Sequence, residues 1–114
     1  MKHYMKLKPF PFEMIKSGKK TIELRLFDEK RQKINPCDII EFTNTQTGEV
    51  ITAEVVGLHR FDSFKKLYGS LPLTKCGYTN DDVDNAHYTD MNAYYSDEEQ
   101  EKYGVLGIEL ILKA

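Results

Sequence analysis

Lys20, Glu23 and Arg25 are the residues of this chain whose types and spacing are best suited to chemistry. Gly18 precedes them and is typical of a residue that ends a helix. Polar and apolar side chains alternate over residues 21–26. This is the pattern of a β-strand, so Glu23 and Arg25 share one face of the strand. Because Lys20 lies at the start of that face, the spacing predicts a site for a polar or anionic ligand.

Two interpretations of these side chains are open. In a functional site, Arg25 can pair bidentately with a phosphate or a base edge, and Glu23 can accept a hydrogen bond from an exocyclic amine. If the site is catalytic, Lys20 or Glu23 is the candidate general base. The alternative is a surface lysine beside an exposed Glu23–Arg25 salt bridge, which contributes little stability. We predict the following ligand-binding residues: Lys19, Lys20, Glu23 and Arg25.

A short helix must end just before this site, and a strand must begin there. Pro9 and Pro11 suit the first turn of that helix, Phe12 and Ile15 give it an apolar stripe, and Gly18 ends it. The expected strands are 3–7, 21–27, 38–44, 49–58 and 105–112, with a helix at 64–68, a loop at 71–77 and polar helical structure at 79–103.

Short strands with helices inserted between them predict the fold class. We expect one α+β domain over residues 1–114, built as a small mixed or antiparallel β-barrel decorated by short helices. The strand patterns predict that the apolar side chains share one barrel core. The predicted core residues are Ile22, Leu24, Ile40, Phe42, Val55, Leu106, Ile108 and Leu110.

The charge is distributed unevenly along the chain. Residues 1–35 hold ten basic and four acidic side chains, a net charge of +6, and the remaining residues are net −8. A basic end can steer an anionic ligand to one face, although a solvated surface with internal ion pairs would give the same composition.

Several other functions are not indicated. The three histidines and two cysteines have no metal-ligand spacing, and there is no glycine-rich phosphate loop. We therefore expect no metal and no cofactor. Cys37 and Cys76 are typical of free thiols in a reducing compartment. The sequence has neither a long apolar run nor a signal peptide, so we expect a cytoplasmic protein that does not enter the membrane. The oligomeric state is not indicated.

Tyrosines gather late in the chain. An exposed tyrosine is a good stacking surface for an unpaired base, whereas a buried one packs against the core. We expect Tyr95 and Tyr103 to be structural, and both roles are open for Tyr88 and Tyr94.

The polar strand and its neighbours resemble the ASCH domain (activating signal cointegrator homology) of the PUA-like superfamily. Gly18, Lys20, Glu23 and Arg25 fit the family pattern Gly-x-Lys-x-x-Glu-x-Arg. The resemblance extends over nearly the whole chain, including the closing segment 103–110. One departure is Cys37, which stands where the family usually has a glycine before an aspartate.

The resemblance implies a PUA-like barrel and a cleft that binds RNA, a nucleoside or a nucleotide. One branch of the family hydrolyses N4-acetylcytidine, with a threonine nucleophile at the position of Glu23 and a lysine at that of Lys20. The branch also uses a glutamate before the last helix, a place that Asp82 or Asp84 could take. A carboxylate is a poor substitute for a hydroxyl in making an acyl-enzyme. We therefore expect a binding module, and a hydrolase acting on a modified nucleoside or on RNA is the alternative.

Overall fold

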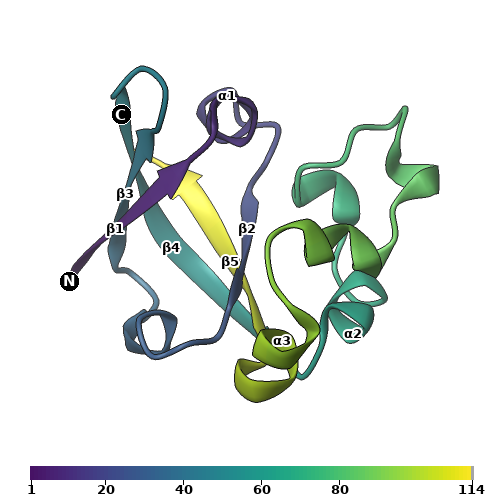
Figure 1. Ribbon diagram of the computed structural model, residues 1–114. Coiled ribbons are helices and arrows are strands. Elements are labelled where there is room, and N and C mark those ends of the chain that lie inside the picture. The colour runs from purple at the N-terminus through teal and green to yellow at the C-terminus, as the bar shows by residue number, and fades with distance from the viewer. Residues whose placement is uncertain (114) are drawn as a thin grey trace.

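The computed structural model describes residues 1–113, and its central element is one curled sheet of five strands (Figure 1). The strands are β1 (Lys2–Leu7), β2 (Ile22–Leu26), β3 (Ile39–Asn44), β4 (Val50–Phe61) and β5 (Val105–Leu112). Their order in the sheet is β1-β3-β4-β5-β2, with β1 parallel to β3 and the other neighbours antiparallel. The sheet forms a half-barrel, so the predicted α+β fold with a mixed barrel and short helices is confirmed.

Short helical elements lie between the strands. Figure 1 shows the first helix close to β1 and β2, and the later helical elements beyond β2. The elements are α1 (Pro9–Lys16), α2 (Phe64–Tyr68), α3 (Asp97–Tyr103) and the 3₁₀ turns η1 (Arg31–Lys33), η2 (Leu73–Lys75), η3 (Val83–Asn85) and η4 (Tyr88–Ala93).

The end of α1 fixes the position of Lys20. Prolines suit the first turn of this helix because the N–H that they lack would be unpaired there in any case. Phe12 and Ile15 lie three residues apart and are both buried. Gly18 has a φ of +80°, which glycine adopts without strain and which turns the chain back. The Lys20 N–H then donates to the Met14 carbonyl over 2.9 Å.

The apolar side chains form two clusters instead of the single core that we predicted. The first fills the half-barrel, where Phe12 of α1 packs with Phe42, Val55 and Ile108 of the sheet. Ile22 and Leu24 do not belong to it. They pack on Phe64 and Leu67 of α2 in the second cluster. The helical elements beyond β2 supply a second apolar surface, and this surface covers the side chains of β2 that alternation turns away from the barrel.

Side chains from β2 and from the segment that follows it bond to the other edge strand, β1. The Arg25 guanidinium donates from Nη2 to the Lys6 carbonyl over 3.1 Å. The Lys30 ammonium donates to the Tyr4 carbonyl over 3.0 Å. These bonds satisfy carbonyl groups on the edge of β1 that pairs with no strand. Cationic groups therefore line the open side of the half-barrel, between β1 and β2.

We predicted polar helical structure over residues 79–103. Residues 79–96 instead contain short 3₁₀ turns, and α3 is the α-helix of this region. Local hydrogen bonds explain the difference. The Thr79 N–H donates to Asp82, and the His87 N–H donates to Asp90. Short polar side chains compete in this way with the helical hydrogen bonds of the backbone. Ser96 and Glu99 form a capping box at the start of α3.

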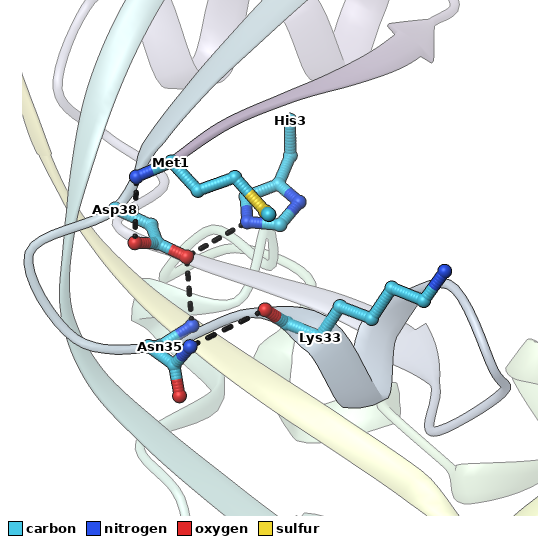
Figure 2. A network of polar contacts seen from close by, with 5 residues as sticks. All are labelled: Met1, His3, Lys33, Asn35 and Asp38. Carbon is cyan, nitrogen blue, oxygen red and sulfur yellow. Dashed lines mark hydrogen bonds and ion pairs between the residues drawn. The ribbon is translucent and has the colours of Figure 1, made fainter.

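A buried polar network holds the turn before β3 (Figure 2). The Asp38 carboxylate accepts hydrogen bonds from His3 Nε2 over 2.8 Å, from the Asn35 N–H over 3.0 Å and from the Met1 amino group over 3.1 Å. The preceding residue, Cys37, has a φ of +75°. That region favours glycine, which is the residue the family usually has there.

Candidate nucleotide-binding cleft

A cleft of about 520 Å³ lies between two walls that are far apart in the sequence. One wall comes from β1, α1 and β2, and the other from α2, η4 and the segments around them. A cavity of this size is within the range of small-molecule sites. Its lining residues are Lys6, Leu7, Lys8, Phe10, Pro11, Met14, Lys20, Glu23, Leu24, Arg25, Tyr68, Cys76, Gly77, Tyr78, Asp82, Asp90, Met91, Tyr94 and Tyr95.

Lys20, Glu23 and Arg25 form one ion-paired group in the lining of this cleft. Lys20 Nζ lies 2.8 Å from Glu23 Oε1. Arg25 donates from Nε to the other carboxylate oxygen, Oε2, over 3.0 Å, and its Nη2 lies 2.8 Å from the same oxygen. Glu23 is 3% exposed, so this is a buried arrangement and not the exposed salt bridge considered above. The carboxylate holds the two cations in fixed positions beside the cavity.

Two opposing effects set the pKa of Glu23. Burial raises the pKa, but the charges and hydrogen bonds of Lys20 and Arg25 lower it by more, so it lies below the ordinary value. The pKa of Arg25 is reduced by burial and raised by more through Glu23, so the guanidinium stays charged. The group therefore has a net charge of +1 at neutral pH.

Unpaired cations and aromatic rings also line the cleft. Lys6 and Lys8 are exposed and line the cleft. Phe10 on α1 is 67% exposed, and Tyr94 across the cleft is 66% exposed. Two large exposed rings at one cavity are suited to stacking on a planar ligand.

The opposite wall carries a chain of hydrogen bonds. The Tyr68 and Tyr78 hydroxyl groups lie 2.7 Å apart, and the Tyr78 hydroxyl donates to Asp90 Oδ2 over 2.7 Å. The Tyr78 hydroxyl therefore accepts from Tyr68. Burial, followed by these hydrogen bonds, raises the pKa of Tyr78 well above its ordinary value. The hydrogen bond from Tyr78 lowers the pKa of Asp90, so Asp90 is ionised at neutral pH.

Cys76 also lines the cleft but is 5% exposed. Its thiol donates a weak hydrogen bond to the Pro72 carbonyl over 3.6 Å. Burial raises its pKa to about 11. The thiol is therefore protonated at neutral pH and is a poor nucleophile.

The cleft is less basic than the charge of residues 1–35 suggests, because four basic and three acidic side chains line it. Lys2 pairs with Glu41, and Lys16 pairs with Glu49. Lys19, which we predicted as a ligand-binding residue, is exposed and lines a separate shallow depression next to Thr79. It therefore lies outside the group formed by the other predicted site residues.

Sequence reasoning missed Lys6, Lys8, Phe10 and the Tyr78–Asp90 pair. Phe10 does have a local signal, because it is an aromatic residue outside the apolar stripe of α1. The pairing of Tyr78 with Asp90 has no local signal, because it depends on how residues 64–95 fold over β2. Of the late tyrosines, Tyr94 lies at the cleft, Tyr88 and Tyr103 pack on the second apolar cluster, and Tyr95 does both.

Neither a metal centre nor a membrane-spanning helix is found within residues 1–113. No three His, Cys, Asp or Glu side chains of this part of the chain are grouped so that they could hold a metal ion. No helix in the same range has the length and apolar character needed to cross a membrane.

Comparison with known proteins identifies similar chains. The family model of the ASCH domain matches residues 5–113. Hypothetical protein PH0355 is 34% identical with a TM-score of 0.85, and the match covers 99% of this chain and 100% of that one. Protein PF0455 from Pyrococcus furiosus is 30% identical with a TM-score of 0.75 over 98% and 97% of the two chains.

A more distant structure shares the fold. ASCH from Zymomonas mobilis is 17% identical with a TM-score of 0.64, and the match covers 96% of this chain and 66% of that one. A search of the curated proteins finds no significant match.

Proposed function

The chain belongs to the ASCH domain family, and we propose that it binds a nucleotide, free or within single-stranded RNA, in the cleft described above. The observation that carries this proposal is the buried group of Lys20, Glu23 and Arg25 beside a cavity with two exposed aromatic rings. Fixed cations suit an anion, and exposed rings suit a base. A nucleotide has both parts.

The cationic wall would bind the phosphate. Arg25 uses Nε and Nη2 to bond Glu23 and the Lys6 carbonyl, and its Nη1 has no hydrogen-bond partner within residues 1–113. Lys6 and Lys8 can move to the ligand because both are exposed. Glu23 acts as a positioning residue, because it holds Lys20 and Arg25 without contacting the phosphate itself.

The aromatic rings would bind the base. Phe10 and Tyr94 come from opposite walls of the cleft, so a planar ring can contact either one or lie between them. Stacking of a base on an aromatic side chain is worth about 1–3 kcal/mol and tolerates any base. This contact would add affinity without depending strongly on sequence.

The chemistry of Glu23 and the residues near it supports binding over hydrolysis. Both oxygens of Glu23 are paired with cations and its pKa is lowered, which makes it a weak general base. Thr21 does not line the cleft, and the Cys76 thiol is protonated at neutral pH. The hydrolase branch that the motif resembles uses a threonine where this chain has Glu23.

Two charge-matched double variants test the proposal. Lys6→Ala/Lys8→Ala removes two exposed lysines of the cleft, and Lys19→Ala/Lys33→Ala removes two exposed lysines elsewhere. Figure 2 shows the Lys33 side chain extending away from the Asp38 network. Affinity for a fluorescent single-stranded RNA is measured by anisotropy over a series of salt concentrations.

We expect the cleft variant to bind more weakly and with a smaller salt slope. Each lysine that no longer neutralises a phosphate should reduce the log–log slope by roughly 0.7. The control variant should bind like the parent protein, although both variants have the same net charge. Equal weakening in the two variants would show that the RNA responds only to overall charge, and the proposal would then be wrong.

A further inference from the structure

We propose that Asp90 selects the base by accepting a hydrogen bond from an exocyclic amino group, so that the cleft prefers cytosine and adenine to uracil and guanine. This inference rests on the proposed function and specifies the ligand within it. The observations behind it are the position of Asp90 in the cleft and the way its two carboxylate oxygens are used.

The carboxylate of Asp90 has one occupied and one available oxygen. Oδ2 accepts from the Tyr78 hydroxyl over 2.7 Å and from the His87 N–H over 3.2 Å. Oδ1 has no hydrogen-bond partner within residues 1–113. Asp90 is exposed and lines the cleft.

The orientation of the carboxylate is fixed from two directions. Asp90 closes a capping box at the start of η4, where its side chain accepts from the His87 N–H. On the other side, the Tyr78 hydroxyl is held by the Tyr68 hydroxyl. Tyr78 has only one hydroxyl hydrogen, which it gives to Asp90, so it has none left for a ligand. The wall therefore presents a hydrogen-bond acceptor that is already in place.

A single ionised acceptor distinguishes bases by their hydrogen-bond donors. Cytosine and adenine each have one amino group that can donate to one oxygen. Uracil has a carbonyl in place of the cytosine amino group, and two acceptors that face each other repel. Guanine has the O6 carbonyl at the position of the adenine amino group, so it meets the carboxylate with an acceptor, as uracil does.

The charges of the two walls favour the same orientation of the ligand, with its base toward Asp90. The basic groups Lys6 and Arg25 lie on β1 and β2, and Lys8 is the N-cap residue of α1. The acidic groups Asp82 and Asp90 come from the opposite wall. A phosphate at the first wall places the base toward the second, where it can meet Asp90.

The test measures dissociation constants for CMP, UMP, AMP and GMP by isothermal titration calorimetry. We expect CMP to bind about tenfold more tightly than UMP, because the uracil O4 carbonyl cannot donate to the carboxylate as the cytosine amino group does. AMP should likewise bind more tightly than GMP. Asp90→Asn should remove most of the CMP preference, because an amide can donate as well as accept. Asp84→Asn is the matched control, because Asp84 is exposed and does not line the cleft.

A second variant tests the role of the occupied oxygen without changing Asp90. Tyr78→Phe removes one of the two hydrogen bonds that orient the Asp90 carboxylate, so the preference for CMP over UMP should shrink while the charge of the cleft is unchanged. This variant also keeps the test decisive if Asp90→Asn disturbs η4, which circular dichroism and thermal unfolding would reveal.

The possible outcomes separate the two claims. If CMP and UMP bind equally to the parent protein, the inference about Asp90 is wrong and the proposed function still holds. If neither these nucleotides nor short single-stranded RNA binds, the proposed function is wrong and the inference fails with it.

Discussion

Cys37 has a backbone conformation that residues other than glycine rarely adopt. Its φ is +75°, and it precedes Asp38 in the turn before β3. The left-handed region costs a residue with a Cβ atom roughly 1–2 kcal/mol. Because glycine carries an entropic cost in the unfolded chain that offsets part of this strain, we expect Cys37→Gly to raise the free energy of unfolding by up to about 1 kcal/mol.

Urea unfolding measures this effect, with an unchanged m-value showing that the two states are comparable. Cys37→Ser is the control, because serine keeps the Cβ atom and therefore the strain. An equal increase in both variants would show that the thiol, and not the backbone conformation, is responsible.

The two cysteines should also differ in reactivity. Cys37 is exposed, whereas Cys76 is buried and its pKa is raised to about 11. Because the thiolate is the reactive form, we expect a thiol reagent near neutral pH to modify Cys37 in the folded protein and Cys76 only after unfolding. Mass spectrometry of the modified peptides reads this out. Rapid modification of Cys76 in the folded protein would contradict its burial at the cleft.

At the scale of elements, β2 depends on the charge pairing of Glu23. Removal of this carboxylate leaves Lys20 and Arg25 close together and largely buried. Removing one partner of a buried ion pair typically costs about 3–5 kcal/mol. We therefore expect Glu23→Ala to lower the free energy of unfolding by about 3 kcal/mol. Chemical denaturation measures it.

Glu41→Ala is the matched control for that variant. Glu41 pairs with Lys2 in a more exposed position on β3, and removing an exposed pair typically changes stability by less than about 1 kcal/mol. A similarly small decrease for Glu23→Ala would mean that water reaches Lys20 and Arg25 and screens their charges.

The contact between β1 and the turn before β3 should weaken at acidic pH. The pKa of Asp38 is lowered to about 2 by hydrogen bonds from His3 and the Asn35 N–H and by the Met1 amino group. Since the folded pKa lies below the unfolded value of about 3.9, this contribution to stability is complete above about pH 4 and is lost as the pH falls to about 2.

The comparison of Asp38→Asn with the parent protein isolates this contribution from those of other carboxylates. We expect the melting temperature of the variant to be lower at neutral pH, and the gap between the two proteins to close as the pH falls through this range. A gap that is independent of pH would show that the charge of Asp38 does not stabilise the fold.

Local patterns were sufficient to predict most elements. Alternation located the strands, and Gly18 marked the end of the first helix. The sequence could not show that the polar face of β2 is buried, because burial of Glu23 depends on partners held by other elements. It also could not separate the two apolar clusters, since an apolar residue on a strand packs equally well on a sheet or a helix.

At the scale of the whole molecule, the cleft joins two chemically different walls. The motif residues Lys20, Glu23 and Arg25 were predictable, because Glu23 and Arg25 alternate on β2 and Lys20 lies just before this strand. The opposing Tyr78 and Asp90 were not, because they reach the cleft through turns that local polar hydrogen bonds form. The excess of basic residues near the N-terminus was a weaker guide, since several of them are paired elsewhere.

The central claim is that this cleft is where a nucleotide binds, and nuclear magnetic resonance tests it most directly. Titration of CMP into the ¹⁵N-labelled protein maps the backbone amide groups that sense the ligand. We predict that shifts concentrate at Leu24, Arg25, Gly77 and Tyr94, which line both walls of the cleft. Shifts confined to neighbouring residues on the outside of the sheet, such as Tyr4, Glu41 and Thr52, would contradict the account.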